Sequence, residues 1–267
     1  MRPTTTAATF PVRVSQPLVT WFLWYAQRYV ARHFHSLRVS RATAPPVNRT
    51  GPLVIYVNHA SWWDPMTCAL IARTYFRDRL SFTPIDAAAL EKYKFFKRLG
   101  FFPVDQKHRR GAAQFLRTAE AVLQDSSHVL WLTPQGRFAD VRERPLGFRA
   151  GLGHLPRLVE RATFVPLAVE YAFWEEKSPE ILVRFGDPIS VTRAHADSLD
   201  AKGWTAVFER QMQATQEALA DQVLRRDTAE FDSVLHGTAG VGGIYDAWRR
   251  FRAALHGQRI NLEHGTR

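Results

Sequence analysis

Apolar residues recur along this chain at two spacings, and these spacings separate the expected strands from the expected helices. Short apolar runs bounded by turn residues predict buried strands, at 37–40, 53–57, 80–83, 101–104, 129–132, 164–169 and 181–185. Longer stretches with apolar positions on one helical face predict helices at 17–36, 66–75, 86–99, 111–125, 152–162 and 196–225. Because strands and helices alternate, we expect an α/β fold: a single domain with a mixed, largely parallel sheet flanked by helices.

The same pattern divides the chain into three parts. Residues 1–45 hold a loose leader and a helix, residues 46–230 hold the α/β domain, and residues 231–267 hold a loop and a basic helix. Within the domain, Gly100 is expected to end a helix as its C-cap, since glycine readily adopts the left-handed conformation. Pro166 interrupts an apolar strand and predicts an edge position or a bulge, because proline has no backbone N–H for the sheet.

The strand at 53–57 runs directly into a polar cluster that contains a histidine and an aspartate. In α/β sheets, binding groups gather beyond the carboxyl ends of strands, so His59 is a candidate general base and Asp64 the carboxylate that orients it. Residues five apart do not share a face of a helix or a strand, so the two side chains meet only if the backbone turns between them. A second interpretation stays open: Ser61 and Asp64 have the spacing of a capping box, in which the aspartate acts only on the helix start.

The net charge and the cysteine content limit which partners and which kinds of site this chain can have. The 267-residue chain has 36 Lys and Arg against 25 Asp and Glu, a formal net charge of +11, which favours nucleic acid, anionic lipid or acidic substrates. No helix-turn-helix, RNP or zinc-knuckle pattern supports nucleic acid, so a membrane surface is the expected partner. The single cysteine, Cys68, excludes a disulfide framework and a cysteine zinc cluster, and an unpaired thiol suits a reducing cytoplasm.

The N-terminal helix is the expected membrane contact. No stretch reaches the roughly 18 uninterrupted apolar residues of a transmembrane helix, and polar residues interrupt the nearest one, 18–34. Its aromatic residues and the arginines that follow indicate an interfacial helix; these aromatic residues are Trp21, Phe22, Trp24, Tyr25 and Tyr29. The alternative is an amphipathic helix that packs on the domain's own core. His33 and His35 lie two apart, but no third ligand is evident, and we expect no metal site.

Five stretches, taken in order, resemble the glycerolipid acyltransferases, the group that includes 1-acylglycerol-3-phosphate acyltransferase. Residues 58–64, Asn-His-Ala-Ser-Trp-Trp-Asp, resemble the family's N-H-x4-D block, and residues 100–106 resemble its second block. Residues 134–137 stand where the family has P-E-G-T-R, residues 148–151 resemble F-K-x-G, and residues 165–168 resemble its V-P strand. Such an ordered set is far more specific than a single His-x4-Asp.

The resemblance implies a membrane-associated O-acyltransferase that moves a fatty acyl group from acyl-CoA or acyl carrier protein to a hydroxyl of a lyso-lipid or related lipid. It implies that His59 removes the hydroxyl proton, that Asp64 orients the imidazole, and that backbone N–H groups near Gly136 stabilise the oxyanion. It also implies a peripheral or monotopic enzyme on the cytoplasmic side of the cell membrane, without a metal or redox cofactor and without a nucleic-acid partner. The residues expected to bind the substrates are Asn58, Gln106, Lys107, Arg109, Gln135, Gly136, Arg137 and Arg149.

Some of these positions depart from the family pattern. Gln106 stands where the second block ends in arginine, Gln135 stands where the third has glutamate, and Arg137 is shifted by one position from the family's arginine. Glutamine cannot make the bidentate charged contact that arginine makes with phosphate. We therefore hypothesise that the acceptor is not lysophosphatidate but a lyso-lipid with another head group, or a sugar- or pigment-linked hydroxyl. The alternative is that Arg137, Lys107, Arg109 or Arg149 compensates for the missing charge. A catalytically inactive lipid-binding or scaffold protein of the same fold is the alternative function.

Overall fold

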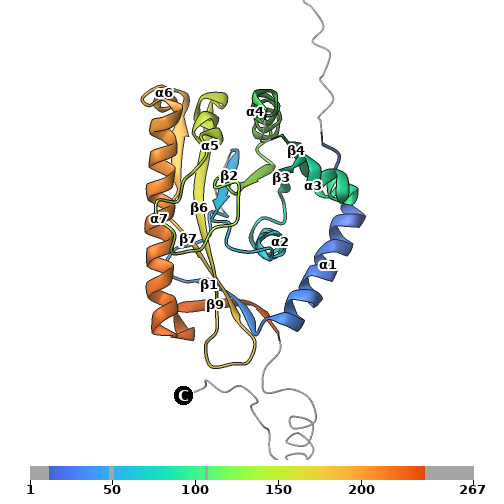
Figure 1. Ribbon diagram of the computed structural model, residues 1–267, viewed down its shortest axis with the longest axis vertical. Helices are drawn as coiled ribbons and strands as arrows, with labels where there is room; N and C mark the ends of the chain where they lie inside the picture. The colour runs from blue at the N-terminus through green and yellow to red at the C-terminus, as the bar shows by residue number, and fades with distance from the viewer. Residues whose placement is uncertain (1–11, 48–50, 106–107, 238–267) are drawn as a thin grey trace, which may run out of the picture.

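The described residues, 12–47, 51–105 and 108–237 of the computed structural model, build one nine-stranded sheet with helices on both faces (Figure 1). The strands follow the order β4-β3-β5-β2-β6-β7-β1-β9, and β8 pairs with β6 beside this path. The strands are β1 (Ser36–Ser40), β2 (Leu53–Val57), β3 (Leu80–Asp86), β4 (Phe101–Val104), β5 (His128–Leu132), β6 (Arg161–Ala172), β7 (Glu180–Phe185), β8 (Ile189–Thr192) and β9 (Phe231–His236). The α-helices are α1 (Gln16–His33), α2 (Asp64–Tyr75), α3 (Ala87–Lys92), α4 (Arg109–Leu123), α5 (Gly151–His154), α6 (Arg193–Ala196) and α7 (Ala201–Arg225), and the 3-10 helices are η1 (Lys94–Leu99), η2 (Leu155–Leu158) and η3 (Thr228–Glu230).

β2 lies in the middle of the sheet because it is apolar throughout. All of its residues are buried, as expected of a strand that is covered on both faces. It pairs in parallel with β5 and β6, and the pairs β3–β5, β3–β4 and β1–β7 are parallel as well. Among the described strands, the antiparallel pairs are β6–β7, β6–β8 and β1–β9. The predicted α/β fold with a mixed, largely parallel sheet is confirmed.

The two faces of β2 belong to separate hydrophobic clusters. Leu53, Ile55 and Val57 pack with residues of α1 and α2, whereas Val54 and Tyr56 pack with residues of α4 and α7. In Figure 1, α7 lies to the left of the sheet, and α2 and α1 lie to the right. Burying one such side chain contributes roughly 1.5–3 kcal/mol, so the alternation along one strand fixes which helices cover which face.

Two predicted helices are shorter than their apolar patterns suggested. The helix expected at 86–99 is divided into α3 and η1 at Tyr93, whose φ of −119° and ψ of 64° leave the helical region. Gly100 ends η1 with a φ of 96°, which confirms the predicted C-cap. The helix expected at 152–162 ends early because β6 already begins at Arg161, where it pairs with β8. Sheet pairing overrides local helical preference at this point.

The prediction of a bulge at Pro166 is confirmed, and the alternative of an edge strand is wrong. Between the pairs Phe164–Ile189 and Leu167–Phe185, two residues of β6 lie opposite three residues. Pro166 lies inside β6, opposite Tyr56 of β2 on one side, and on the other side its C=O accepts the N–H of Gly186 at 2.9 Å. β8 pairs with β6 as far as Phe164, and β7 pairs with it from Leu167 onward. The missing N–H of the proline therefore faces the turn between β7 and β8, where it removes no hydrogen bond from the sheet.

Residues 231–236 belong to the sheet. We expected 231–267 to begin with a loop, but β9 pairs antiparallel with β1 over these first residues. This pairing satisfies backbone groups of β1 that would otherwise form an open edge. The basic helix expected further along lies outside the described residues, and the three-part division of the chain stays a prediction.

Gly100→Ala should destabilise the fold more than Gly51→Ala. Both glycines have a positive φ, 96° and 92°, so alanine costs roughly 1–2 kcal/mol of backbone strain at either position. An alanine Cβ at Gly100 would lie 2.2 Å from the carbonyl oxygen of Ser81, whereas at Gly51 it would meet nothing within 4 Å. Urea denaturation should show an additional loss of about 1–3 kcal/mol for Gly100→Ala. Equal losses in the two variants would contradict this packing.

Candidate active site

A turn after β2 brings His59 and Asp64 together. Nδ1 of His59 lies 2.8 Å from Oδ2 of Asp64, so the turn that their spacing requires is present. Asp64 is the first residue of α2, where the N-terminal end of the helix dipole favours a negative charge. The histidine side chain is 20% exposed and the aspartate side chain 2% exposed, so the imidazole reaches the surface while its partner is buried.

The Asp64 carboxylate accepts hydrogen bonds through both of its oxygens. Besides the contact with His59, Oδ2 accepts the backbone N–H of Ser61 at 3.0 Å, and Oδ1 accepts the hydroxyl of Tyr171 at 2.7 Å. Ser61 lies before the helix, because the N-cap of α2 is Trp63 and has no side-chain cap, so this contact is not the predicted capping box. Of the two interpretations left open by the sequence, the contact between His59 and Asp64 is present and the capping box is wrong.

Tyr171 is kept in its protonated form. Its hydroxyl lies 3.2 Å from Oγ1 of Thr67 on α2. Burial raises the pKa of Tyr171 well above its ordinary value, and the negative charge of Asp64 raises it further. The phenol thus stays a donor to Asp64, and a connected chain of side chains leads from Thr67 to the imidazole of His59.

The loop after β5 holds the backbone of His59 on both sides. Oε1 of Gln135 accepts the backbone N–H of His59 at 2.9 Å, and the backbone C=O of His59 accepts the N–H of Ala139 at 2.9 Å. The ring of Phe138 lies against the imidazole, with the centroids 4.3 Å apart and the planes tilted by 41°. β5 pairs in parallel with β2, so the loop after β5 reaches the residues that follow β2.

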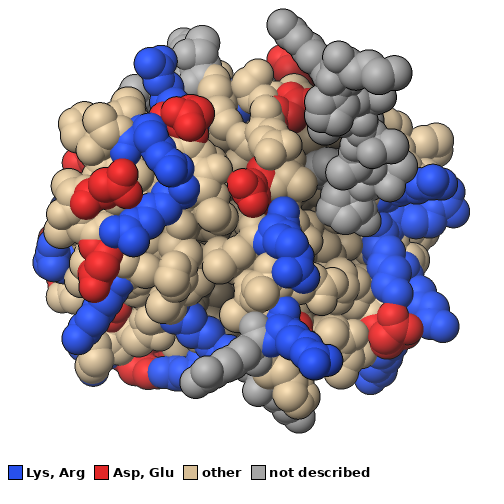
Figure 2. Space-filling model, turned by 90° about the horizontal axis from the view of Figure 1, so that it is seen from above, with Lys and Arg blue, Asp and Glu red and all other residues tan. Residues whose placement is uncertain are grey.

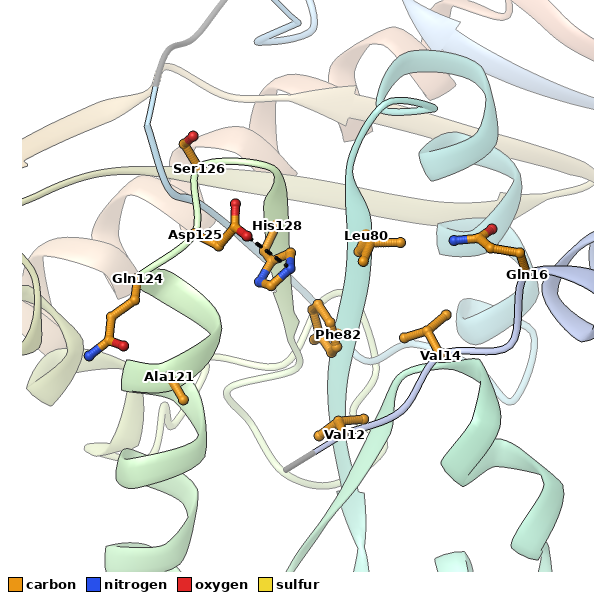
Figure 3. A pocket seen from close by; sticks show the side chains of 10 residues that line it. All are labelled: Val12, Val14, Gln16, Leu80, Phe82, Ala121, Gln124, Asp125, Ser126 and His128. Carbon is orange, nitrogen blue, oxygen red and sulfur yellow. Dashed lines mark ion pairs between the residues drawn. The ribbon is translucent and has the colours of Figure 1, made fainter. Parts of the chain in front are cut away.

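A cavity of about 620 Å³ adjoins the histidine and aspartate through Ser61 and Tyr171. A second cavity of the same volume lies at the amino ends of β3 and β5, around Leu80 and His128 (Figure 3). There Asp125 forms an ion pair with His128 at an N–O distance of 3.6 Å. Because ligands of α/β sheets bind beyond the carboxyl ends of the strands, the first cavity is the candidate substrate site.

The arrangement suits proton transfer. A carboxylate that accepts the Nδ1 proton fixes the tautomer of the imidazole and leaves Nε2 as the basic nitrogen. Within the ranges that the structure describes, no three His, Cys, Asp or Glu side chains gather as metal ligands would.

The region that holds these residues matches a protein-family model. The model of the acyltransferase family matches residues 32–170, more than half of the chain. The chain belongs to the acyltransferase family. The resemblance drawn from the five sequence stretches is confirmed, and with it an enzyme that transfers acyl groups. No curated protein matches this acyltransferase.

Two residues expected to bind substrates are engaged within the protein. The side-chain amide of Asn58 donates to the C=O of Val169 at 2.9 Å and accepts its N–H at 2.7 Å, which ties the turn after β2 to β6. Gly136 has a φ of 64°, and its N–H donates to the C=O of Thr133 at 3.0 Å. The N–H of Gly136 itself is therefore engaged within the loop, and the expectation of oxyanion donors near Gly136 stays a prediction.

The other motif residues expected to bind substrates each make a different contact where the structure describes their side chains. Arg137 pairs with Glu143, at 3.1 Å for one of its two N–O contacts. Arg149 is exposed, and its guanidinium lies against Gly136. Its Nε is 2.6 Å from the position that a Cβ would occupy on a larger residue at position 136. Gln135 is 4% exposed and contacts the backbone of His59, so it supports the histidine. Gln106 and Lys107 lie outside the described residues, and so does the side chain of Arg109, although its backbone begins α4.

Tyr171 is the residue of this acyltransferase site that the sequence interpretation omitted. The strand predicted at 164–169 stopped two residues before it, whereas β6 continues to Ala172. Alternation along β6 places Tyr171 on the same face as Leu167 and Val169, so a longer strand was the signal that could have found it. No local sequence pattern could have predicted the contact between Tyr171 and Asp64, since the two residues are 107 positions apart.

Tyr171→Phe should lower the stability of the acyltransferase, whereas Tyr56→Phe should not. Tyr171 donates to a buried carboxylate, and hydrogen bonds to charged groups contribute roughly 1.5–3 kcal/mol. The hydroxyl of Tyr56 is buried without a hydrogen-bond partner among the described residues, so removing it should leave the free energy of unfolding unchanged or raise it by up to about 1 kcal/mol. Urea denaturation measures both variants. An equal loss at the two positions would show that the contact with Asp64 is not the cause.

Proposed function

We propose that this protein is a membrane-associated O-acyltransferase that moves a fatty acyl group from an acyl thioester to a hydroxyl of a lyso-lipid or related lipid acceptor. The observation that carries the proposal is the 2.8 Å contact between His59 and Asp64 beside a cavity. The buried carboxylate holds the imidazole through Nδ1 and leaves the other nitrogen for a substrate hydroxyl. Family membership supports acyl transfer in general, and this geometry supports a hydroxyl as the acceptor.

In the proposed reaction, Nε2 of His59 takes the proton of the acceptor hydroxyl while the hydroxyl oxygen attacks the thioester carbonyl. The new C–O bond gives a tetrahedral intermediate, which collapses by cleavage of the C–S bond. The imidazolium returns its proton to the departing thiolate, so His59 ends in its starting state. Asp64 stabilises the imidazolium, while Ser61 and Tyr171 keep the carboxylate in place. The scheme requires no metal or redox cofactor.

The proposed donor is acyl-CoA or acyl carrier protein, which suits a chain of net charge +11. On the face seen in Figure 2, Lys and Arg side chains lie among acidic and uncharged residues and do not form one continuous tract. Dispersed positive charge attracts an anionic partner over a distance but gives a phosphate backbone no continuous track. We therefore do not propose nucleic acid as a partner.

The two sides of α1 support association with a membrane surface. One side packs on the domain through Phe22, Ala26 and Val30, so the packing alternative holds as well. The other side exposes Trp21 and Trp24, at 53% and 55% of their surface. Exposed tryptophans on an amphipathic helix are typical of a helix that lies in the membrane interface.

More aromatic and basic side chains lie next to α1. The N–H of Ser15, just before α1, donates to the C=O of Arg98 in η1 at 2.8 Å. The α3–η1 segment exposes Tyr93 and Phe95 among basic residues, which suits a peripheral or monotopic enzyme on anionic lipid. We propose the cytoplasmic side, where a free thiol such as Cys68 stays reduced. Among the helices within the described ranges, none is long and apolar enough to cross a bilayer.

His59→Ala should abolish acyl transfer and leave membrane association intact. A general base contributes about 100-fold or more, so transfer from labelled acyl-CoA to a panel of lyso-lipids should fall at least about 100-fold. His195→Ala is the matched control, because His195 is an exposed histidine on α6, away from the site. Retained turnover in His59→Ala would contradict the mechanism. A wild-type protein that binds vesicles and acylates no acceptor would favour the inactive lipid-binding or scaffold protein.

Replacing both Trp21 and Trp24 by alanine should weaken binding to anionic vesicles by roughly tenfold or more, because each indole removes apolar area from the interface. Leu224→Ala serves as the control, since Leu224 is 79% exposed on α7. Co-sedimentation with vesicles measures both variants. A similar loss in the control would show that α1 is not the membrane contact.

A further inference from the structure

Glu170 is a half-buried carboxylate in the cavity beside His59. β2 ends at Val57, opposite Leu167, whereas β6 continues to Ala172, so the end of β6 lines the cavity where β2 no longer covers it. No hydrogen bond or ion pair reaches the Glu170 carboxylate from the residues that the structure describes. Burial raises the pKa of Glu170, which the positive charge of Arg142 partly offsets. The carboxylate is therefore an acceptor without a donor.

A second acceptor in the same cavity also has no donor. Gln216 lines the cavity from α7, which packs beside β6 (Figure 1), and its side chain is almost fully buried. Its Nε2 lies 3.4 Å from the C=O of Val141, but its Oε1 has no hydrogen-bond partner among the described residues. Buried acceptors without donors are unfavourable, and native proteins seldom retain them. A ligand that brings several hydroxyl groups would satisfy Glu170, which is half-buried in the lining, whereas Oε1 of Gln216 is closed off from solvent.

The charges around the cavity disfavour a phosphate head group. Its lining contains the guanidinium groups of Arg142 and Arg144 and three carboxylates, those of Asp140, Glu170 and Glu217. Arg142 is already paired with Asp140 through two contacts of 2.8 Å and 2.7 Å. A phosphomonoester would bring more acceptors and meet the carboxylates of Glu170 and Glu217. A neutral polyhydroxyl group avoids this repulsion and donates to Glu170 without placing a second positive charge beside Arg144.

The apolar part of the lining is aromatic. Phe34 and Trp63 face the cavity from one side, together with Tyr171, whose hydroxyl donates to Asp64. Aromatic side chains offer flat apolar area to the C–H face of a sugar ring and to a hydrocarbon chain. A ligand in the cavity thus contacts the tyrosine that holds the aspartate of the proposed catalytic pair.

We propose that this cavity binds the head group of the acyl acceptor, and that this head group is an uncharged polyhydroxyl group, as in a glycosyl lipid, whose hydroxyls donate to Glu170. The inference rests on the proposed function and names the class of its acceptor. It selects the sugar-linked hydroxyl from the acceptors that the altered motif positions leave open.

The test measures binding without an acyl donor, so its outcome does not depend on turnover. Isothermal titration of the full chain uses octyl glucoside, octyl phosphate and octylammonium, each below its micelle concentration. Glu170→Gln removes the half-buried carboxylate. Glu160→Gln is the matched control, since Glu160 is exposed just before the start of β6 and is not part of the lining. Ala220→Leu, a third variant, fills the cavity from α7 without changing charge.

Octyl glucoside should bind the wild-type protein most tightly of the three. Glu170→Gln should weaken its binding roughly tenfold, as expected for the loss of hydrogen bonds to a charged acceptor, and should strengthen the binding of octyl phosphate. Ala220→Leu should also weaken glucoside binding, and Glu160→Gln should leave it unchanged. The proposal is overturned if octyl phosphate or octylammonium binds more tightly, if the glucoside does not bind, or if the two glutamate variants behave alike. If the glucoside binds as expected and the enzyme still transfers no acyl group, the proposed function fails while the binding site stands.

Discussion

The buried carboxylate of Asp64 is the group on which the site depends. An anion that is almost fully removed from water requires donors, and here they come from three parts of the fold: the His59 ring, the backbone of Ser61 and the hydroxyl of Tyr171. The order of strands makes this possible, because β2 and β6 are parallel neighbours and both end at the same edge of the sheet. Asn58 ties the end of β2 to Val169, two residues before the tyrosine. The framework that positions the proposed base is therefore built largely by backbone pairing.

The sequence predicted the centre of this site and the fold that carries it, because both have local signals. A continuous apolar run indicates a central strand. A histidine and an aspartate in the turn after it, His59 and Asp64, indicate a site at the carboxyl end of that strand. The contacts that hold Asp64 and the backbone of His59 in place have no such local sequence pattern, since they depend on the order of the strands in the sheet. Tyr171 could be placed on a face of β6 by alternation, but only the sheet brings it to Asp64. Pro166 predicted a bulge, but which strands form it could not be predicted, because the bulge is a property of β6, β7 and β8 together.

Several motif residues that resemble substrate contacts prove to be parts of the architecture. Gln135 accepts the backbone N–H of His59, so a neutral side chain at this position keeps the histidine in place without adding a second buried negative charge beside Asp64. Arg137 pairs with Glu143 and is thereby partly neutralised. The altered positions that the structure describes thus leave the proposed base intact. In the proposed function, the neighbouring cavity discriminates between acceptors through Glu170, whose carboxylate has no donor among the described residues.

The central claim is that Asp64 holds the neutral imidazole of His59 with its proton on Nδ1 and leaves Nε2 free as the base. Nitrogen-15 NMR of the protein labelled in its histidines tests this most directly, with His59→Ala used to assign the resonances. The claim predicts that the neutral His59 ring carries its proton on Nδ1, and that Asp64→Asn shifts the ring toward the other tautomer. A neutral ring with its proton on Nε2, unchanged by Asp64→Asn, would contradict it.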